Sequence, residues 1–124
     1  MRLSPMRNRM SITIYHNPRC SKSRAALSLL REQGIEPEIV EYLKEPPDVA
    51  TLGRLLDMLG LEPRDLIRKK EPEYKANNLD NPALTREQLV AAMVAHPKLI
   101  ERPIVVKGEK AILGRPPESV LELV

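Results

Sequence analysis

The chain has 124 residues, 42% of them hydrophobic, which suits one soluble domain with a buried core. It contains neither Phe nor Trp, so we expect Leu, Ile, Val, Met and Ala to fill that core. Its 20 Lys and Arg against 17 Asp and Glu give a net charge of only +3, and no stacking aromatics accompany its basic runs, which argues against nucleic acid as a partner.

The first ten residues, MRLSPMRNRM, are basic and lack the apolar stretch of a signal peptide. We expect residues 1–10 to be a flexible N-terminal tail and residues 11–124 to be a single domain. No segment of the chain approaches the ~20 apolar residues that a membrane span needs. We therefore expect a cytoplasmic protein with no membrane partner.

The first elements have the order strand, helix, strand. Ser11–His16 is rich in β-branched residues and predicts a strand that stops at the turn dipeptide Asn17-Pro18. Residues 20–33 contain neither Pro nor Gly and predict a helix, which Gly34 ends. Glu38–Leu43 predicts the next strand. A helix between two strands makes a βαβ unit, so we expect these strands to be parallel.

Helical patterns fill the middle of the chain. Leucines at helical spacing follow Pro46-Pro47-Asp48 and predict a helix that Gly60 closes. These leucines are Leu52, Leu55, Leu56 and Leu59. A short helical piece is expected at Pro63–Lys69, and the polar segment Glu71–Asn81 is expected to be irregular.

The capping box formed by Thr85 and Gln88 predicts a further helix, running to about Ala95. Pro103–Lys107 and Lys110–Leu113 flank Gly108 and predict a hairpin. Pro116-Pro117 then begins a terminal helix with Val120, Leu121 and Leu123. This order of elements predicts a thioredoxin-like α/β fold, in which a four-stranded mixed sheet has helices on both faces.

Cys20 is the only cysteine, so it cannot form an internal disulfide, and nothing in the chain requires an oxidising compartment. It lies in the predicted first helical turn, where unpaired backbone N–H groups and the helix dipole stabilise an anion. Arg19, Lys22 and Arg24 add positive charge, which lowers the pKa of a thiol. We therefore predict a reactive thiolate. The residues expected to support its loop are Asn17, Ser21, Ser23 and Arg24.

Other roles for this cysteine fit the sequence less well. Most lone cysteines are small buried hydrophobes, but the neighbours of Cys20 are polar. A C-x-x-C dithiol needs a cysteine where Ser23 stands, and the C-x5-R loop of tyrosine phosphatases needs an arginine where Ala26 stands. One Cys and two His are too few and too badly spaced for a metal site, so we expect none.

Four segments closely resemble the glutaredoxin-linked arsenate reductase family, and they occur in the family's order. They are YHNPRCSKSR, LIRKKE, ERPIVV and GRPPE, and the similarity extends from Ile12 to Leu123. The resemblance implies a thioredoxin-like fold and the reduction of arsenate to arsenite. It also implies glutathione as co-substrate, glutaredoxin as partner and no tightly bound cofactor.

The resemblance implies roles for five residues. Cys20 takes the place of the nucleophile, and His16 that of the histidine before the Asn-Pro turn. Arg68, Arg102 and Arg115 match the arginines that bind the oxyanion and hold the arsenic intermediates. Arginine suits this role because it is permanently charged and bidentate. Taken singly, each arginine could instead be solvated or cap a strand end, and the histidine could be a hydrogen-bonded strand-end residue.

The family also places a cis proline before its third strand, so we expect the Arg102-Pro103 peptide to be cis. The cysteine loop departs from the N-P-A-C-G-T-S-R type of the best-known members, because Arg19, Ser21 and Lys22 give N-P-R-C-S-K-S-R. This loop matches a chromosomal branch of the family.

Two other functions compete with arsenate reduction. One is a general glutathione-linked thiol oxidoreductase. The other is a stress regulator of this fold that binds RNA polymerase. Such regulators usually carry a C-x-x-C redox switch, which Ser23 removes here, so we rank this function last.

Overall fold

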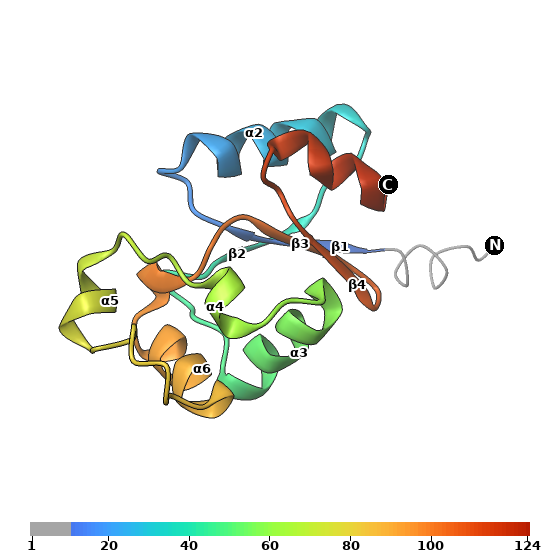
Figure 1. Ribbon diagram of the computed structural model, residues 1–124. Helices are drawn as coiled ribbons and strands as arrows, with labels where there is room; N and C mark the ends of the chain where they lie inside the picture. The colour runs from blue at the N-terminus through green and yellow to red at the C-terminus, as the bar shows by residue number, and fades with distance from the viewer. Residues whose placement is uncertain (1–10) are drawn as a thin grey trace. The chain divides into compact units, whose positions relative to one another are not determined.

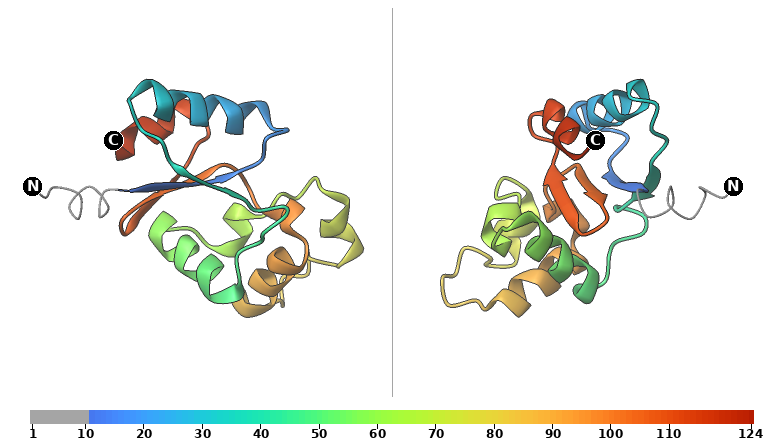
Figure 2. Two further views of the ribbon diagram at one scale, coloured as in Figure 1. Left: turned by 180° about the vertical axis from the view of Figure 1, so that it is seen from behind. Right: turned by 90° about the vertical axis from the view of Figure 1, so that its right-hand side faces the viewer.

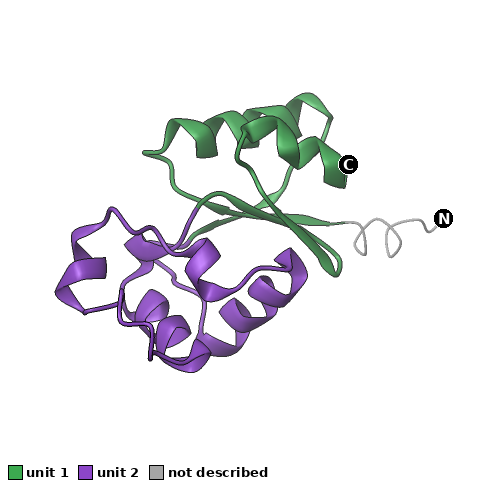
Figure 3. Ribbon diagram, in the orientation of Figure 1, with its two compact units in different colours: residues 1–41, 102–124 green, residues 42–101 purple. Residues whose placement is uncertain are grey.

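The computed structural model describes residues 11–124, which divide into two compact units (Figure 3). One unit comprises the described residues up to Glu41 together with Arg102–Val124, and the other comprises Tyr42–Glu101. The expected tail, residues 1–10, lies outside the described residues. That residues 11–124 act as a single domain stays a prediction. Within the part of the chain that is described, no helix has both the length and the apolar character needed to cross a membrane.

The first unit contains a four-stranded mixed sheet. Its strands are β1 (Ile12–His16), β2 (Glu38–Glu41), β3 (Ile104–Lys107) and β4 (Lys110–Leu113), in the spatial order β2-β1-β3-β4. The β1–β2 pair is parallel, as the βαβ pattern predicts, and the other two pairs are antiparallel. Gly108 adopts φ 61 in the β3–β4 turn, which confirms the predicted hairpin.

Helices α2 (Ser21–Glu32) and η2 (Pro117–Leu123) lie together on one face of this sheet (Figures 1 and 2). Helix α2 turns Ser23, Ala26, Leu27 and Leu30 inward, which is one stripe at helical spacing. The core beneath it also includes Ile12, Ile14, Val105 and Val120. The terminal helix forms where predicted, but it is a 3-10 helix.

The second unit is helical. It contains α3 (Val49–Leu59), α4 (Pro63–Leu66), α5 (Pro72–Ala76), α6 (Arg86–Ala95) and η1 (Pro97–Leu99). Asp48 caps α3 by accepting a hydrogen bond from the backbone N–H of Thr51 at 2.8 Å, and Gly60 ends the helix at φ 69. Thr85 and Gln88 form the predicted capping box of α6.

Some predicted boundaries were wrong. The segment Glu71–Asn81 is not wholly irregular, because Pro72 begins α5; this helix buries no side chain and so carries no apolar period. Helix α4 ends at Leu66 rather than Lys69, since Ile67 leaves the helix to pair with Ile100. Strand β2 ends two residues early, at Glu41.

Candidate active site

Cys20 is the N-cap residue of α2 and has extended backbone angles, φ −96 and ψ 122. Its N–H donates to the carbonyl of Asn17 at 3.0 Å, and its carbonyl accepts the N–H of Arg24 at 3.0 Å. The residue as a whole is nearly covered, with a relative exposure of 9%. The predicted position at the start of the first helix is therefore confirmed.

Two hydrogen bonds tie the loop before Cys20 to its neighbours. The Asn17 side chain accepts the N–H of Arg19 at 3.0 Å, which tightens the turn. The guanidinium of Arg24 donates to the carbonyl of Pro18 at 2.8 Å and ties the loop to the second turn of α2. Asn17 and Arg24 thus each make a contact within the loop. Ser21 is exposed, and the supporting roles of these residues and of Ser21 stay predictions.

A buried pair joins the end of β1 to α2. His16 and Ser23 are 5% and 0% exposed, and Nδ1 of the histidine lies 2.6 Å from Oγ of the serine. The same Oγ accepts the N–H of Asn17 at 3.0 Å. The hydroxyl proton is then available to Nδ1, which fits a neutral imidazole that carries its own proton on Nε2.

Burial, rather than the largest nearby charge, favours the neutral form of the His16 imidazole. Burial lowers the pKa of His16 from its ordinary value. The carboxylate of Glu41 opposes this by raising the pKa, while Arg31 and Arg24 lower it further. The lowered pKa thus favours neutral His16, whose direct partner is the serine hydroxyl.

The surroundings of Cys20 favour its thiolate. Burial by itself raises the pKa of the thiol. Hydrogen bonding to the backbone N–H of Ser23, the positive charge of Arg102 and hydrogen bonding to the N–H of Lys22 lower it by more, and the Arg102 side chain adds a hydrogen bond. The net pKa of Cys20 is below its ordinary value, as expected for a nucleophilic cysteine.

Arg102 and Arg115 flank the open end of the β3–β4 hairpin. The register pairs Ile104 with Leu113, and the N–H of Gly114 donates to the carbonyl of Pro103 one step further, at 2.9 Å. The two arginines follow next, one from each strand. The peptide bond from each to its proline, Pro103 or Pro116, is cis, which confirms the prediction for Arg102 and adds a second case.

Arg68 belongs to the second unit. Its guanidinium is 3.2 Å from the carboxylate of Glu71 and 3.9 Å from that of Glu101, and it donates to the carbonyl of Lys98 at 3.4 Å. Its side chain is 25% exposed. Arg68 is therefore held between two carboxylates within its own unit, and its predicted contact with an oxyanion stays a prediction.

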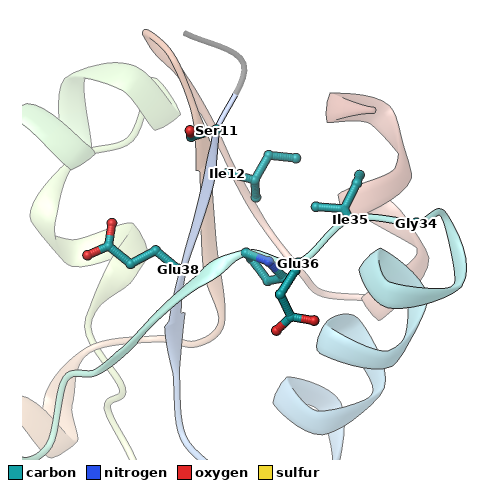
Figure 4. A pocket seen from close by; sticks show the side chains of 7 residues that line it. Ser11, Ile12, Gly34, Ile35, Glu36 and Glu38 are labelled. Atoms are coloured by element: carbon teal, nitrogen blue, oxygen red, sulfur yellow. The ribbon is translucent and has the colours of Figure 1, made fainter. Parts of the chain in front are cut away.

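A pocket among the described residues lies away from the thiol (Figure 4). Its lining residues are Ser11, Ile12, Gly34, Ile35, Glu36, Pro37 and Glu38. Ile12 and Ile35 point toward each other in it. The pocket lies at Ile12, the first residue of β1, and Cys20 follows His16, the last residue of that strand. The length of the strand, roughly 16 Å, therefore separates them. Across residues 11–124, no group of His, Cys, Asp and Glu could hold a metal ion.

Three contributions to this site were missed at the level of sequence. Ser23 is the hydrogen-bond partner of His16, whereas the sequence indicates for it only a role in supporting the Cys20 loop. Glu41 acts on the same imidazole and carries no motif of its own. Gly114 stands against Pro103, and its only signal was its position before the second Arg-Pro pair.

Comparison with known sequences and structures gives consistent results. The sequence model of the ArsC family matches residues 15–123 of this chain. The uncharacterized protein YfgD of Escherichia coli K12 is 58% identical over 114 residues, which cover 91% of this chain and 96% of that protein. An arsenate reductase of Neisseria meningitidis serogroup A is 52% identical over 110 residues, covering 88% and 94%.

A solved structure of an arsenate reductase from Vibrio cholerae has a TM-score of 0.90 and is 54% identical. The alignment covers 93% of this chain and 98% of that one. The residues that the family model matches, 15–123, include parts of both compact units and the loop that carries Cys20. The thioredoxin-like fold predicted from the order of elements is thereby confirmed.

Proposed function

This chain belongs to the ArsC family, and on that premise we propose that it is an arsenate reductase with the Cys20 thiolate as its nucleophile. One observation carries the proposal beyond family membership. The only cysteine caps a helix, and the N–H of Ser23 and the guanidinium of Arg102 depress its pKa. A lowered pKa enlarges the share of thiolate at neutral pH, and the thiolate is the form that attacks a small oxyanion.

In the first step the thiolate of Cys20 attacks the arsenic of arsenate. One arsenate oxygen leaves as water after taking up protons, and a sulfur–arsenic(V) bond forms. The positive charge of Arg102 offsets the negative charge that approaches the thiolate. We assign Arg115, at the same end of the hairpin, to the same oxyanion. Arg68 is assigned to it by the family motif.

The second step needs an external thiol, because Ser23 stands where a resolving cysteine would be needed. Glutathione adds to the arsenic and a second water leaves. A glutaredoxin thiolate then attacks the glutathione sulfur, which leaves as a mixed disulfide while arsenic(V) takes two electrons and becomes arsenic(III). Water releases arsenite and returns the cysteine as a thiol.

This scheme requires no tightly bound cofactor, since all electrons come from thiols. It also places the reaction in the cytoplasm, where glutathione keeps a lone cysteine reduced. The exposed cations Arg19 and Lys22 flank the thiol and suit the approach of an anionic thiol such as glutathione.

The test is NADPH oxidation coupled through glutathione reductase, glutaredoxin and glutathione, with and without arsenate. We expect arsenate-dependent turnover that Cys20→Ser abolishes and that Ser28→Ala, at an exposed serine of α2 away from the loop, retains. Turnover on a glutathione mixed disulfide with none on arsenate would overturn the proposal in favour of a general thiol oxidoreductase. No turnover on either, with retention on RNA polymerase, would favour a regulator.

A further inference from the structure

We propose that Gly114 is a positioning residue for the thiol site. Because it has no side chain, the end of the β3–β4 hairpin closes tightly on Pro103, and this contact sets the place of Arg102 beside Cys20. The inference rests on the proposed function, since it concerns the site of that reaction. Its central measurement, however, is a property of the thiol and needs no arsenate turnover.

The contact is closer than any side chain allows. Gly114 is buried, and its N–H donates to the carbonyl of Pro103 at 2.9 Å. A Cβ added there would lie 2.8 Å from Cγ and 3.3 Å from Cδ of Pro103, and 3.2 Å from Cγ1 of Val120. Gly114 is not among the positive-φ glycines of the described chain, so it is this contact, rather than backbone conformation, that excludes a side chain.

The packing around Gly114 determines which residues would shift if a side chain were added there. Val120 is 0% exposed and belongs to the core cluster under α2, so it has little room to withdraw. The pyrrolidine ring of Pro103 cannot rotate away from an added methyl group as an open side chain could. Ile104 and the residues after it are held by pairing to both β1 and β4. The chain N-terminal to Ile104, which is Arg102 and Pro103, is therefore the part that moves.

Movement of Arg102 has a direct chemical consequence. Its guanidinium hydrogen-bonds the Cys20 sulfur and contributes positive charge there. Coulomb attraction falls with distance, and the hydrogen bond is lost sooner still. A displaced Arg102 therefore stabilises the thiolate less, although Arg102 itself is unchanged.

The experiment compares Gly114→Ala with Arg102→Ala, singly and together, in a Gly53→Ala background. Gly53 lies in α3, an added Cβ there meets nothing within 4 Å, and alanine stabilises a helix interior relative to glycine. Gly53→Ala is thus both the matched control and a more stable host. The readout is the pH dependence of Cys20 alkylation in the full chain, with far-UV circular dichroism as the check of folding.

We expect Gly53→Ala alone to leave the alkylation midpoint unchanged and Gly114→Ala to raise it toward that of Arg102→Ala. Alkylation at pH 7 should then slow by about two-fold or more, as the thiolate fraction falls. In the Arg102→Ala chain, adding Gly114→Ala should change nothing further, because both act through one guanidinium.

An unchanged midpoint in Gly114→Ala would overturn the inference. An equal rise of the alkylation midpoint on adding Gly114→Ala with and without Arg102 would also overturn it. So would failure of Gly114→Ala to fold in the Gly53→Ala host, because the added methyl group would then not be accommodated by a local shift of Arg102. If the midpoint shifts as expected while the parent protein shows no arsenate turnover, the proposed function fails and the positioning role stands.

Discussion

Ser23→Ala removes a single hydroxyl that serves the buried His16 and the half-buried N–H of Asn17. Oγ of this serine lies 2.6 Å from Nδ1 of His16 and accepts the N–H of Asn17 at 3.0 Å, and the serine is 0% exposed. Alanine leaves both groups without that partner. An unsatisfied buried group costs about 1–3 kcal/mol, and the half-buried N–H of Asn17 falls at the lower end of that range, about 1 kcal/mol. We therefore expect a total loss of about 2–4 kcal/mol. At roughly 4 °C per kcal/mol for a chain of this size, Tm should fall by about 8–16 °C.

The measurement is urea unfolding followed by circular dichroism, with Ser28→Ala as the matched control. Ser28 is an exposed serine on the same helix, so its replacement should change stability by no more than about 0.5 kcal/mol. If Ser23→Ala and Ser28→Ala unfold at the same urea concentration, the Ser23 hydroxyl does not hold the end of β1 to α2, and the reasoning is refuted.

Three further predictions concern acid stability, the thiol and a helix cap. Burial lowers the pKa of His16 in the folded chain below its ordinary value of 6.5. As the pH drops below 6.5, the unfolded chain therefore binds a proton at His16 more readily than the folded chain does. The free energy of unfolding then falls with pH over this range. His16→Gln should flatten the dependence of Tm on pH between about 7 and 5; equal slopes would contradict this. Arg102→Ala should raise the alkylation pKa of Cys20, whereas a similar rise in Arg19→Ala would mean that general surface charge is responsible. Thr85→Ala should lower the free energy of unfolding by about 1 kcal/mol in urea titrations, and Thr85→Ser, which keeps the cap, should not.

Elements with local signals were predictable. Helix α3 has an apolar stripe, a capping Asp48 and a closing Gly60, and each of these lies within the helix or beside it. Helix α5 has no such stripe, because none of its residues is buried; its start at Pro72 was the only available signal. The end of α4 could not be predicted because pairing of Ile67 with Ile100, a distant residue, overrides local propensity.

The candidate site divides in the same way. The place of Cys20 at a helix start follows from Asn17-Pro18 and the residues after it, all within one turn. The bond between His16 and Ser23 depends on how α2 lies against β1, which no local pattern specifies. The approach of Arg102 to Cys20 joins residues from opposite ends of the chain, and only the family resemblance pointed to it.

The lowered pKa of Cys20 is a balance between opposing effects from two separate segments. Burial raises it, and the N–H groups at the start of α2 together with Arg102 at the hairpin end lower it by more. Loss of Arg102 therefore removes one stabilising effect but leaves the helix N–H groups in place, and water that enters reduces the burial penalty as well. The thiolate should then persist in part in Arg102→Ala. If arsenate turnover falls by more than the thiolate fraction does, the excess measures the second role of this arginine, which is to bind the oxyanion.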